Sequence, residues 1–238
     1  VDADYAELSD RILAAIRGVA DTALASGAAA AQVSATARTG AAAGADATAG
    51  RTPSAPTVRY LVNTHWHFDH VAGNEAFARA GATIIAHERV RRLMSEDRVM
   101  AALGGRRVAA APAAALPVVT FNDRLNLEWN GDLVHLVHMP AAHSDGDIIV
   151  HFRDADIIHM GDLFFNGMYP FIDVDVGGSI AGMARAVEEV LDHTPPTTLF
   201  IPGHGPLAGR GDLERYRDML ATVRGRVQEM IARGMSRA

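Results

Sequence analysis

The segment Thr-His-Trp-His-Phe-Asp-His, residues 64–70, decides how this sequence is interpreted, because it places three histidines and one aspartate within six residues. Side chains two residues apart on an extended chain point to the same face, so His65 and His67 can converge on one ion. Asp69 and His70 follow where the chain turns, and they can face a second ion nearby. Imidazole and carboxylate groups are suitable ligands for Zn²⁺ and related cations. The segment therefore predicts a metal site that can hold two ions.

Three further candidates lie downstream in segments expected to follow strands, where ligand-binding residues usually belong. His143 lies between two expected strands, and Asp162 ends the segment His-Met-Gly-Asp at 159–162. His204 has a glycine on each side, which permits a sharp turn. Taken singly, each could be an ordinary turn or capping residue. Together with the first segment, they complete the following set of candidate metal ligands: His65, His67, Asp69, His70, His143, Asp162 and His204.

Bulk composition narrows the class of protein. The chain has 238 residues, of which 49% are hydrophobic and 21% charged, which is ordinary for a globular domain. The net charge of −6 and the lack of a basic block argue against a nucleic-acid partner. The sequence contains no cysteine, which excludes disulfides and thiolate ligands. No apolar run is long enough to span a membrane and no signal peptide is visible, so the compartment and the oligomeric state stay open.

The pattern along the chain predicts alternating strands and helices. Helices are expected over residues 5–17, 75–80 (with Asn74 as N-cap), 89–100 and 179–191, and from 212 onward. Strands are expected over 58–62, 83–86, 118–121, 124–129, 133–139, 147–152, 156–160 and 198–201, with a hairpin turn at Asn130–Gly131. Mixed elements in this order predict a layered α/β (α+β) sandwich of sheets and helices, as a single domain over 1–238. The Ala- and Gly-rich stretch at about 26–56 is expected to be a flexible insert, although its alanines could support a short helix.

The order of these motifs resembles the metallo-β-lactamase superfamily over about residues 57–210. The features that carry the resemblance are a strand, His-x-His-x-Asp-His, a later loop histidine, Gly-Asp and Gly-His-Gly. The resemblance implies a four-layer αβ/βα sandwich with two metals at one edge of the sheets. It implies that the ligands of the first metal are His65, His67 and His143. It implies that Asp69, His70 and His204 bind the second metal and that Asp162 bridges the two.

The resemblance also implies several β-strands before the first helix, which this sequence lacks. Val1-Asp2 is similar to the residue pair that ends the last of those strands in the family. We therefore expect an N-terminally truncated version of the sandwich, with an unpaired sheet edge and an exposed apolar face.

The activity implied by the resemblance is that of a metal-dependent hydrolase of a small molecule. Two zinc ions would lower the pKa of a bridging water, and the resulting hydroxide would attack an ester, lactone, lactam, thioester or similar bond. Asp69 or Asp162 could orient that water or accept a proton. The candidates for orienting the ligand rings are Asp2, Ser144 and Asp145.

The segment after Asp162 does not resemble the arginine-containing stretch of glyoxalase II, so no glutathione thioester is assigned. The apolar, aromatic run over residues 164–171 is either part of the core or a wall of the substrate pocket. Two other functions stay open. Iron or manganese suits the same nitrogen and oxygen ligands, which allows a mononuclear or di-iron redox enzyme. A truncated copy that binds metal without turnover is the other alternative.

Overall fold

Two β-sheets packed face to face form the centre of the structure. A computed structural model describes residues 1–36 and 58–236. The first sheet is parallel and has the order β1-β2-β5, with strands β1 (Tyr60–Val62), β2 (Thr83–His87) and β5 (Val119–Phe121). The second sheet has the order β10-β9-β8-β7-β6. Its strands are β6 (Arg124–Trp129), β7 (Asp132–His138), β8 (Ile148–Phe152), β9 (Ile157–Phe165) and β10 (Leu199–His204).

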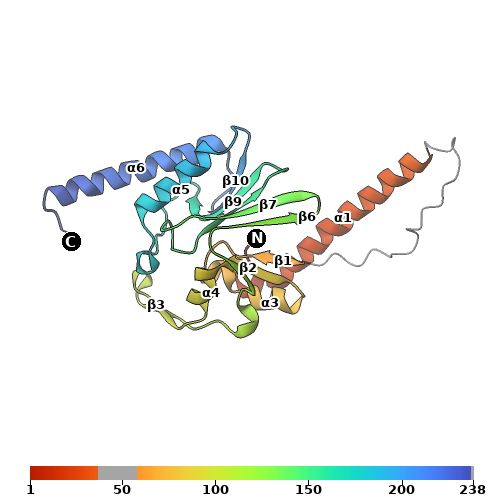
Figure 1. The fold of residues 1–238 in the computed structure, drawn as a ribbon, viewed down its shortest axis with the longest axis horizontal. Coiled ribbons are helices and arrows are strands. Elements are labelled where there is room, and N and C mark those ends of the chain that lie inside the picture. The colour runs from red at the N-terminus through yellow and green to blue at the C-terminus, as the bar shows by residue number, and fades with distance from the viewer. Residues whose placement is uncertain (37–57, 237–238) are drawn as a thin grey trace.

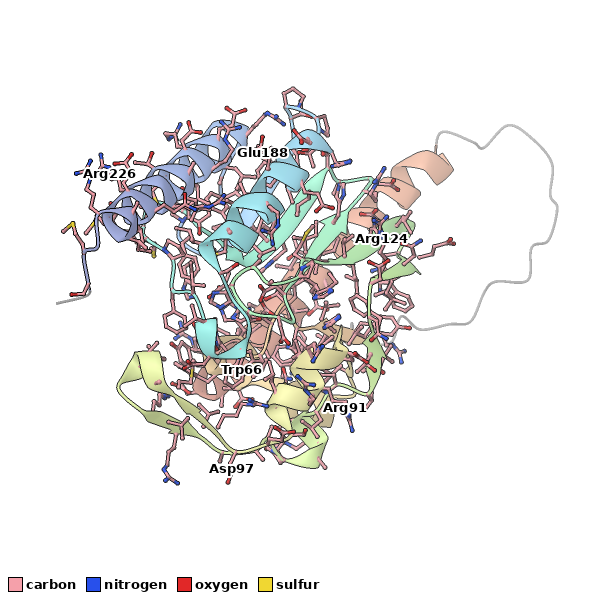
Figure 2. All side chains as sticks on the ribbon, turned by 60° about the vertical axis from the view of Figure 1, so that its left-hand side comes forward. Trp66, Arg91, Asp97, Arg124, Glu188 and Arg226 are labelled. Carbon is pink, nitrogen blue, oxygen red and sulfur yellow. The ribbon has the colours of Figure 1, made fainter. Side chains whose placement is uncertain are left out.

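Helices cover the outer face of each sheet (Figure 1). On the first sheet lie α1 (Ser9–Thr36), which follows a 3-10 turn at Ala6–Leu8, and then α2 (Phe68–Val71), α3 (Asn74–Arg79) and α4 (Glu88–Met94). On the second sheet lie α5 (Ile180–Asp192) and α6 (Arg210–Ala232). Figure 2 shows Glu188 and Arg226 on this second helical layer and Arg91 on α4, at the opposite side of the molecule. No helix in the described ranges is long and apolar enough to cross a membrane.

Apolar side chains fill the space between these four layers. Val62 and Ile85 of the first sheet pack against Leu136, Ile148 and Val150 of the second. On the other side of the second sheet, residues of β9 and β10 pack with α5 and α6 in the largest cluster, which includes Phe164, Phe200, Met183, Val187 and Leu213. A third cluster joins α1 and α3 to β1 and β2. The observed fold is therefore the mixed α/β sandwich that the sequence predicted.

A pair of stacked histidines also joins the two sheets. His87 ends β2 and His138 ends β7, and their ring centroids lie 3.8 Å apart with the planes nearly parallel. His87 Nε2 donates to the carbonyl of Asn122, and its Nδ1 accepts from the backbone N–H of Arg89 at the start of α4. Burial and the neighbouring His138 ring lower the pKa of His87. The lowered pKa favours the neutral form of His87, and the stack holds the ends of the two strands together.

Two short elements differ from the sequence prediction. The helix expected over 89–100 ends at Met94, and Arg98–Met100 forms strand β3, paired with β4 (Arg106–Val108). This hairpin turns through a 3-10 turn at Ala101–Leu103 and two glycines with positive φ, at 104 and 105. Asn74 is the first residue of α3 and does not cap it. Its buried amide instead donates to Asn63 and to the carbonyl of Ala115.

Two further boundaries were also placed differently. β9 runs five residues past the expected end at 160, to Phe165, so Asp162 lies within a strand rather than after one. α1 continues through residue 36 and so includes 26–36, for which a short helix was the alternative expectation. The rest of the Ala- and Gly-rich stretch lies in residues 37–57, outside the described part of the chain.

Candidate metal centre

Four separate segments bring the candidate ligands to one edge of the sandwich. The chain leaves β1 at Val62, and the next residues carry His65 and His67 into the structure before the short helix α2 begins. Asp69 and His70 lie on α2 itself. The other three ligands come from the second sheet: His143 from the β7–β8 loop, Asp162 from β9 and His204 from the last residue of β10. Because β9 and β10 are parallel, their carboxyl ends meet at this edge.

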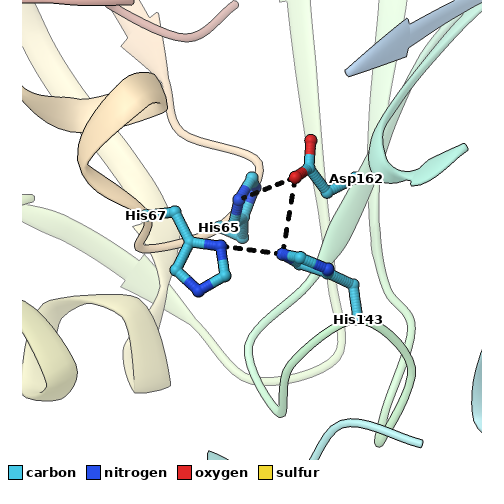
Figure 3. A group of neighbouring side chains, drawn as sticks. All are labelled: His65, His67, His143 and Asp162. Atoms are coloured by element: carbon cyan, nitrogen blue, oxygen red, sulfur yellow. Dashed lines mark hydrogen bonds and ion pairs between the residues drawn. The ribbon is translucent and has the colours of Figure 1, made fainter. Parts of the chain in front are cut away.

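The first group consists of His65, His67, His143 and Asp162, all buried (Figure 3). One ligand atom of each lies within 4.8 Å of the others. His143 Nε2 is 2.8 Å from His67 Nδ1, and Asp162 Oδ2 is 3.5 Å from His143 Nε2 and 3.6 Å from His65 Nε2. Three ring nitrogens and one carboxylate oxygen thus surround a single point.

The second group consists of Asp69, His70 and His204, and it lies closer to solvent. His204 Nε2 is 3.3 Å from Asp69 Oδ2, and His70 Nε2 is 3.6 Å from the same oxygen. Asp162 reaches this group as well, because its Oδ1 is 3.1 Å from His70 Nε2 and its Oδ2 is 3.4 Å from His204 Nε2. Asp162 therefore lies between the two groups and contacts both.

The donor atoms fit a divalent cation in each group. His65 Nε2, His70 Nε2 and Asp162 Oδ1 are buried and make no hydrogen bond of normal geometry. Buried polar atoms are rarely left without a partner, since this costs about 1–3 kcal/mol each. Imidazole nitrogens and carboxylate oxygens that converge in this way are the ligands that zinc and similar metals prefer. The site therefore has the composition and the unpartnered atoms of a metal centre.

Asp2 orients the rings of His70 and His65, the first directly and the second through Thr64. Its Oδ2 accepts from His70 Nδ1 at 2.9 Å and from Thr64 Oγ1 at 2.8 Å, and Thr64 Oγ1 in turn lies 3.0 Å from His65 Nδ1. Each ring thus uses Nδ1 for this network and turns Nε2 toward the candidate ligands. Asp2 was one of the three residues expected from the sequence to orient the ligand rings, and the structure places it in contact with one of them.

The other two rings are held by a segment that the sequence did not indicate. Asp173 is buried, and its Oδ2 accepts from His67 Nε2 at 2.9 Å, which leaves His67 Nδ1 facing the site. The carbonyl of Phe171 accepts from His143 Nδ1 at 2.9 Å, and the backbone N–H of Asp173 donates to the His143 carbonyl. Nothing in the local pattern around Asp173 distinguishes it from an ordinary loop aspartate, because its partner lies 106 residues away.

Ser144 and Asp145, the remaining two expected orienting residues, bond elsewhere. Ser144 donates to Asp147 through its backbone N–H and its hydroxyl, which closes the loop that carries His143. The side chain of Asp145 lies 3.7 Å from Arg89, and its carbonyl accepts from His138. They therefore shape the loop rather than contact a candidate ligand ring, and the expectation for them was wrong.

Electrostatics favour positive charge at this site. Burial raises the free energy of an ionised Asp162, but the nearby rings of His65, His204 and His70 outweigh it, so the pKa of Asp162 falls well below its usual range. Burial lowers the pKa of His70, yet Asp2 and Asp162 overcome it and raise that pKa to about 11. Burial lowers the pKa of His143 to about 4 and that of His65 well below its usual range. In the first group, an ionised Asp162 beside neutral His65 and His143 is the protonation state that a cation requires, whereas His70 in the second group must lose its proton when a cation binds.

The remaining six histidines lie outside the two groups of candidate metal ligands. His135 and His151 form a cross-strand pair on β7 and β8, His159 lies on β9, and His193 ends α5. His87 and His138 form the stack between the sheets. Trp66 is buried in the cluster around α4, and its ring centroid lies 5.1 Å from that of His67.

Comparison with known proteins gives a consistent result. The sequence model of the metallo-beta-lactamase superfamily matches residues 46–219. The probable metallo-hydrolase YqgX of Bacillus subtilis is 28% identical over 165 residues, which cover 66% of this chain and 71% of that protein. Hydroxyacylglutathione hydrolase of Erythrobacter litoralis is 31% identical over 110 residues, which cover 46% of this chain and only 35% of that enzyme.

Solved structures with the same arrangement of sheets and helices include metallo-beta-lactamases. The one from Pontibacter korlensis has a TM-score of 0.54 at 20% identity and covers 69% of each chain. The one from Hirschia baltica has a TM-score of 0.51 at 22% identity and covers 68% of each chain. At this level of identity the likeness concerns the fold, and activity must be argued from the site.

Proposed function

Because this chain belongs to the metallo-beta-lactamase superfamily, we propose that it is a hydrolase that uses two divalent cations to cleave a small molecule. The bond is an ester, lactone, lactam, thioester or a similar group, and zinc is the first candidate metal. The observation that carries the proposal is the convergence of seven ligand-type side chains from four segments, with three of their buried polar atoms left without a hydrogen bond.

Each candidate ligand has a role in this proposal. His65, His67 and His143 hold the first cation, and Asp69, His70 and His204 hold the second. Asp162 contributes to both, since its carboxylate lies within 3.6 Å of nitrogens in each group. When bound, such cations supply Lewis acidity, which polarises a substrate oxygen and lowers the pKa of a water molecule.

The two aspartates differ in what they can do during the reaction. Asp162 is buried among histidines and its pKa is lowered, so it stays ionised and serves to hold charge at the centre. Asp69 lies on the side that faces solvent, with 16% of its side chain exposed, beside His204 with 37% exposed. A carboxylate in that position can orient the attacking water and accept its proton. We therefore assign proton transfer to Asp69 rather than Asp162.

Metal analysis followed by a hydrolysis panel tests the proposal. The protein, purified without added metal, is measured by mass spectrometry for zinc, iron and manganese. The metal-loaded protein is then assayed on a β-lactam, a lactone, a thioester, and phosphate and sulfate esters. We expect close to two equivalents of divalent metal and cleavage of at least one class.

Matched histidine variants make the result specific. His67→Ala should remove metal from the first group and abolish activity. His193→Ala should change neither, because His193 is exposed at the end of α5. Iron bound without hydrolysis of any member of the panel would favour the redox alternative and contradict the proposal. Metal bound in both groups with no turnover of any kind would favour a non-catalytic metal-binding protein.

A further inference from the structure

A cavity of about 520 Å³ lies beside the candidate metal centre, at the carboxyl ends of β9 and β10. Residues 165–169, at the end of β9 and just after it, form one wall, and the first turns of α6 form the other, with Pro206 between them. Its volume is within the range of pockets that bind small molecules. Ligands commonly bind outside the carboxyl ends of parallel strands, and this cavity lies at such a position.

The cavity borders the candidate metal ligand His204 at Phe165. That ring lines the cavity and also stacks on the imidazole of His204, with the centroids 5.0 Å apart and the planes 23° from parallel. Asn166 continues the contact, because its backbone N–H donates to the His204 carbonyl and its side chain donates to the Pro206 carbonyl. A molecule that reaches the second group of ligands thus lies next to this wall.

The lining is apolar and aromatic both at the floor of the cavity and at its rim. Phe165 and Tyr216 form the floor and are 6% and 5% exposed. Met168 and Tyr169 stand at the rim and are exposed, Tyr169 by 76%. Large exposed apolar side chains around a hollow are typical of a binding site, and methionine adapts to ligands of different shape. Met219 lines the α6 wall one turn beyond Tyr216.

The charges and polar groups of the lining favour an uncharged ligand. Every residue that lines the cavity lies in the described part of the chain, and only Asp212 and Arg215 among them are charged. These two side chains form an ion pair with each other. Asp212 also accepts from the backbone N–H of Gly209 at 3.0 Å. The Tyr216 hydroxyl is buried near the Phe165 backbone and has no hydrogen bond of normal geometry, so Tyr216 adds no charge to the lining.

We propose that this cavity binds an uncharged apolar group of the substrate, an acyl chain or an aryl ring, while the scissile bond lies at the metal centre. The catalytic part of this statement rests on the proposed hydrolase function. Binding of the apolar group does not, because the cavity is built from residues outside both ligand groups. Because the lining is mostly apolar and its one cation, Arg215, is paired with Asp212, the cavity disfavours anionic groups such as those of a glutathione conjugate.

A binding experiment tests the cavity without catalysis. Hexan-1-ol and benzyl alcohol are titrated into the metal-loaded protein and followed by saturation-transfer NMR. We expect saturable binding to the wild type, weakened at least about tenfold in Met219→Trp, whose indole fills the cavity. Met230→Trp is the matched control, because Met230 is exposed on the same helix and does not line the cavity. Tyr169→Asp, at an exposed position that tolerates substitution, should also weaken binding and decides the question if Met219→Trp fails to fold.

A hydrolysis experiment then connects the cavity to the reaction. Acetyl and hexanoyl substrates with one small leaving group are compared, using the bond type that the panel identifies. Each methylene removed from water can favour the substrate by up to about fourfold, so kcat/KM should be at least about tenfold higher for hexanoyl. This preference should fall to within about twofold in Met219→Trp and Tyr169→Asp, and persist in Met230→Trp.

The two experiments separate the two proposals. Probe binding that the cavity variants weaken, without hydrolysis of any substrate, would support the cavity assignment and contradict the hydrolase function. Hydrolysis without a chain-length preference, together with probe binding that is equal in all variants, would overturn the cavity assignment and leave the hydrolase function standing.

Discussion

At the residue scale, each of four histidines has one ring nitrogen held by a partner and the other turned toward the site. His65 and His70 use Nδ1 for the network of Thr64 and Asp2, whereas His67 uses Nε2 for Asp173. The choice of nitrogen is therefore set by residues outside the ligand groups. Such partners fix the tautomer and orientation of a metal-binding imidazole, and their loss typically weakens metal binding by tenfold to a hundredfold.

Asp173→Asn should therefore weaken binding at the first group of ligands by roughly tenfold or more. An amide at this position can still contact His67 Nε2, but it lacks the charge that favours the proton there. Zinc affinity is measured by competition with a chromophoric chelator. Asp175→Asn is the matched control, because Asp175 is an exposed acid two residues away. Equal affinity in both variants would show that Asp173 does not position His67.

Some residues of the candidate site could be predicted from the sequence alone and others could not. The spacing of residues 64–70 predicted a cluster, because neighbours on one extended segment share a face whatever the rest of the chain does. His143, Asp162 and His204 were placed with the others only by the order of motifs. Asp173 was missed, because its partner His67 is brought to it by tertiary packing and neither residue carries a local sign of the contact.

At the element scale, the long periodic helices and most strands were predictable, while the short β3–β4 hairpin was not. β6 was predicted to the residue, and the Asn130–Gly131 turn joins it to β7 with positive φ at both residues. The residues of β3 were predicted to end a helix, and β4 was not predicted. These two strands are three residues each, too short for alternation to show.

The cap of α5 offers a test of an element. Ser179 accepts from the backbone N–H of Gly182 at 3.0 Å and donates to the Ala141 carbonyl at 2.9 Å, which ties the helix to the loop that carries His143. Ser179→Ala should lower the free energy of unfolding by about 1–2 kcal/mol. Urea unfolding followed by circular dichroism measures this. Ser95→Ala, at the exposed end of α4, should cost less than about 0.5 kcal/mol, and equal costs would contradict the capping role.

At the scale of the whole molecule, one buried and one partly buried neutral histidine make the metal-free protein sensitive to acid. Burial lowers the pKa of His143 and of His159 to about 4. Between about pH 6.5 and 4 the unfolded chain protonates these rings while the folded protein does not, so the unfolded state binds more protons and stability falls as the pH falls. His70, with its pKa raised to about 11, keeps its proton in the folded protein throughout this range, whereas the unfolded chain gains it only as the pH falls to about 6. Its contribution to stability therefore rises as the pH falls from 7.5 to about 6, and this offsets part of the loss.

We therefore expect the free energy of unfolding of chelator-treated protein to drop by roughly 2–3 kcal/mol from pH 7.5 to pH 5. Urea unfolding at the two pH values measures the drop. His159→Gln should reduce it, while His193→Gln, at an exposed position, should leave it unchanged. A wild-type stability that is flat over this range would show that neither ring resists protonation in the folded protein.

The origin of the ligands in two different sheets has a consequence for a chain that has no cysteine. Four of the seven candidate ligands follow the first sheet and three belong to the second, so cations held between them would join the two halves of the sandwich. Secreted domains obtain such cross-links from disulfides. In this protein the bound cations would serve as the cross-links. The ions that activate a substrate would thus also connect segments that are distant in the sequence.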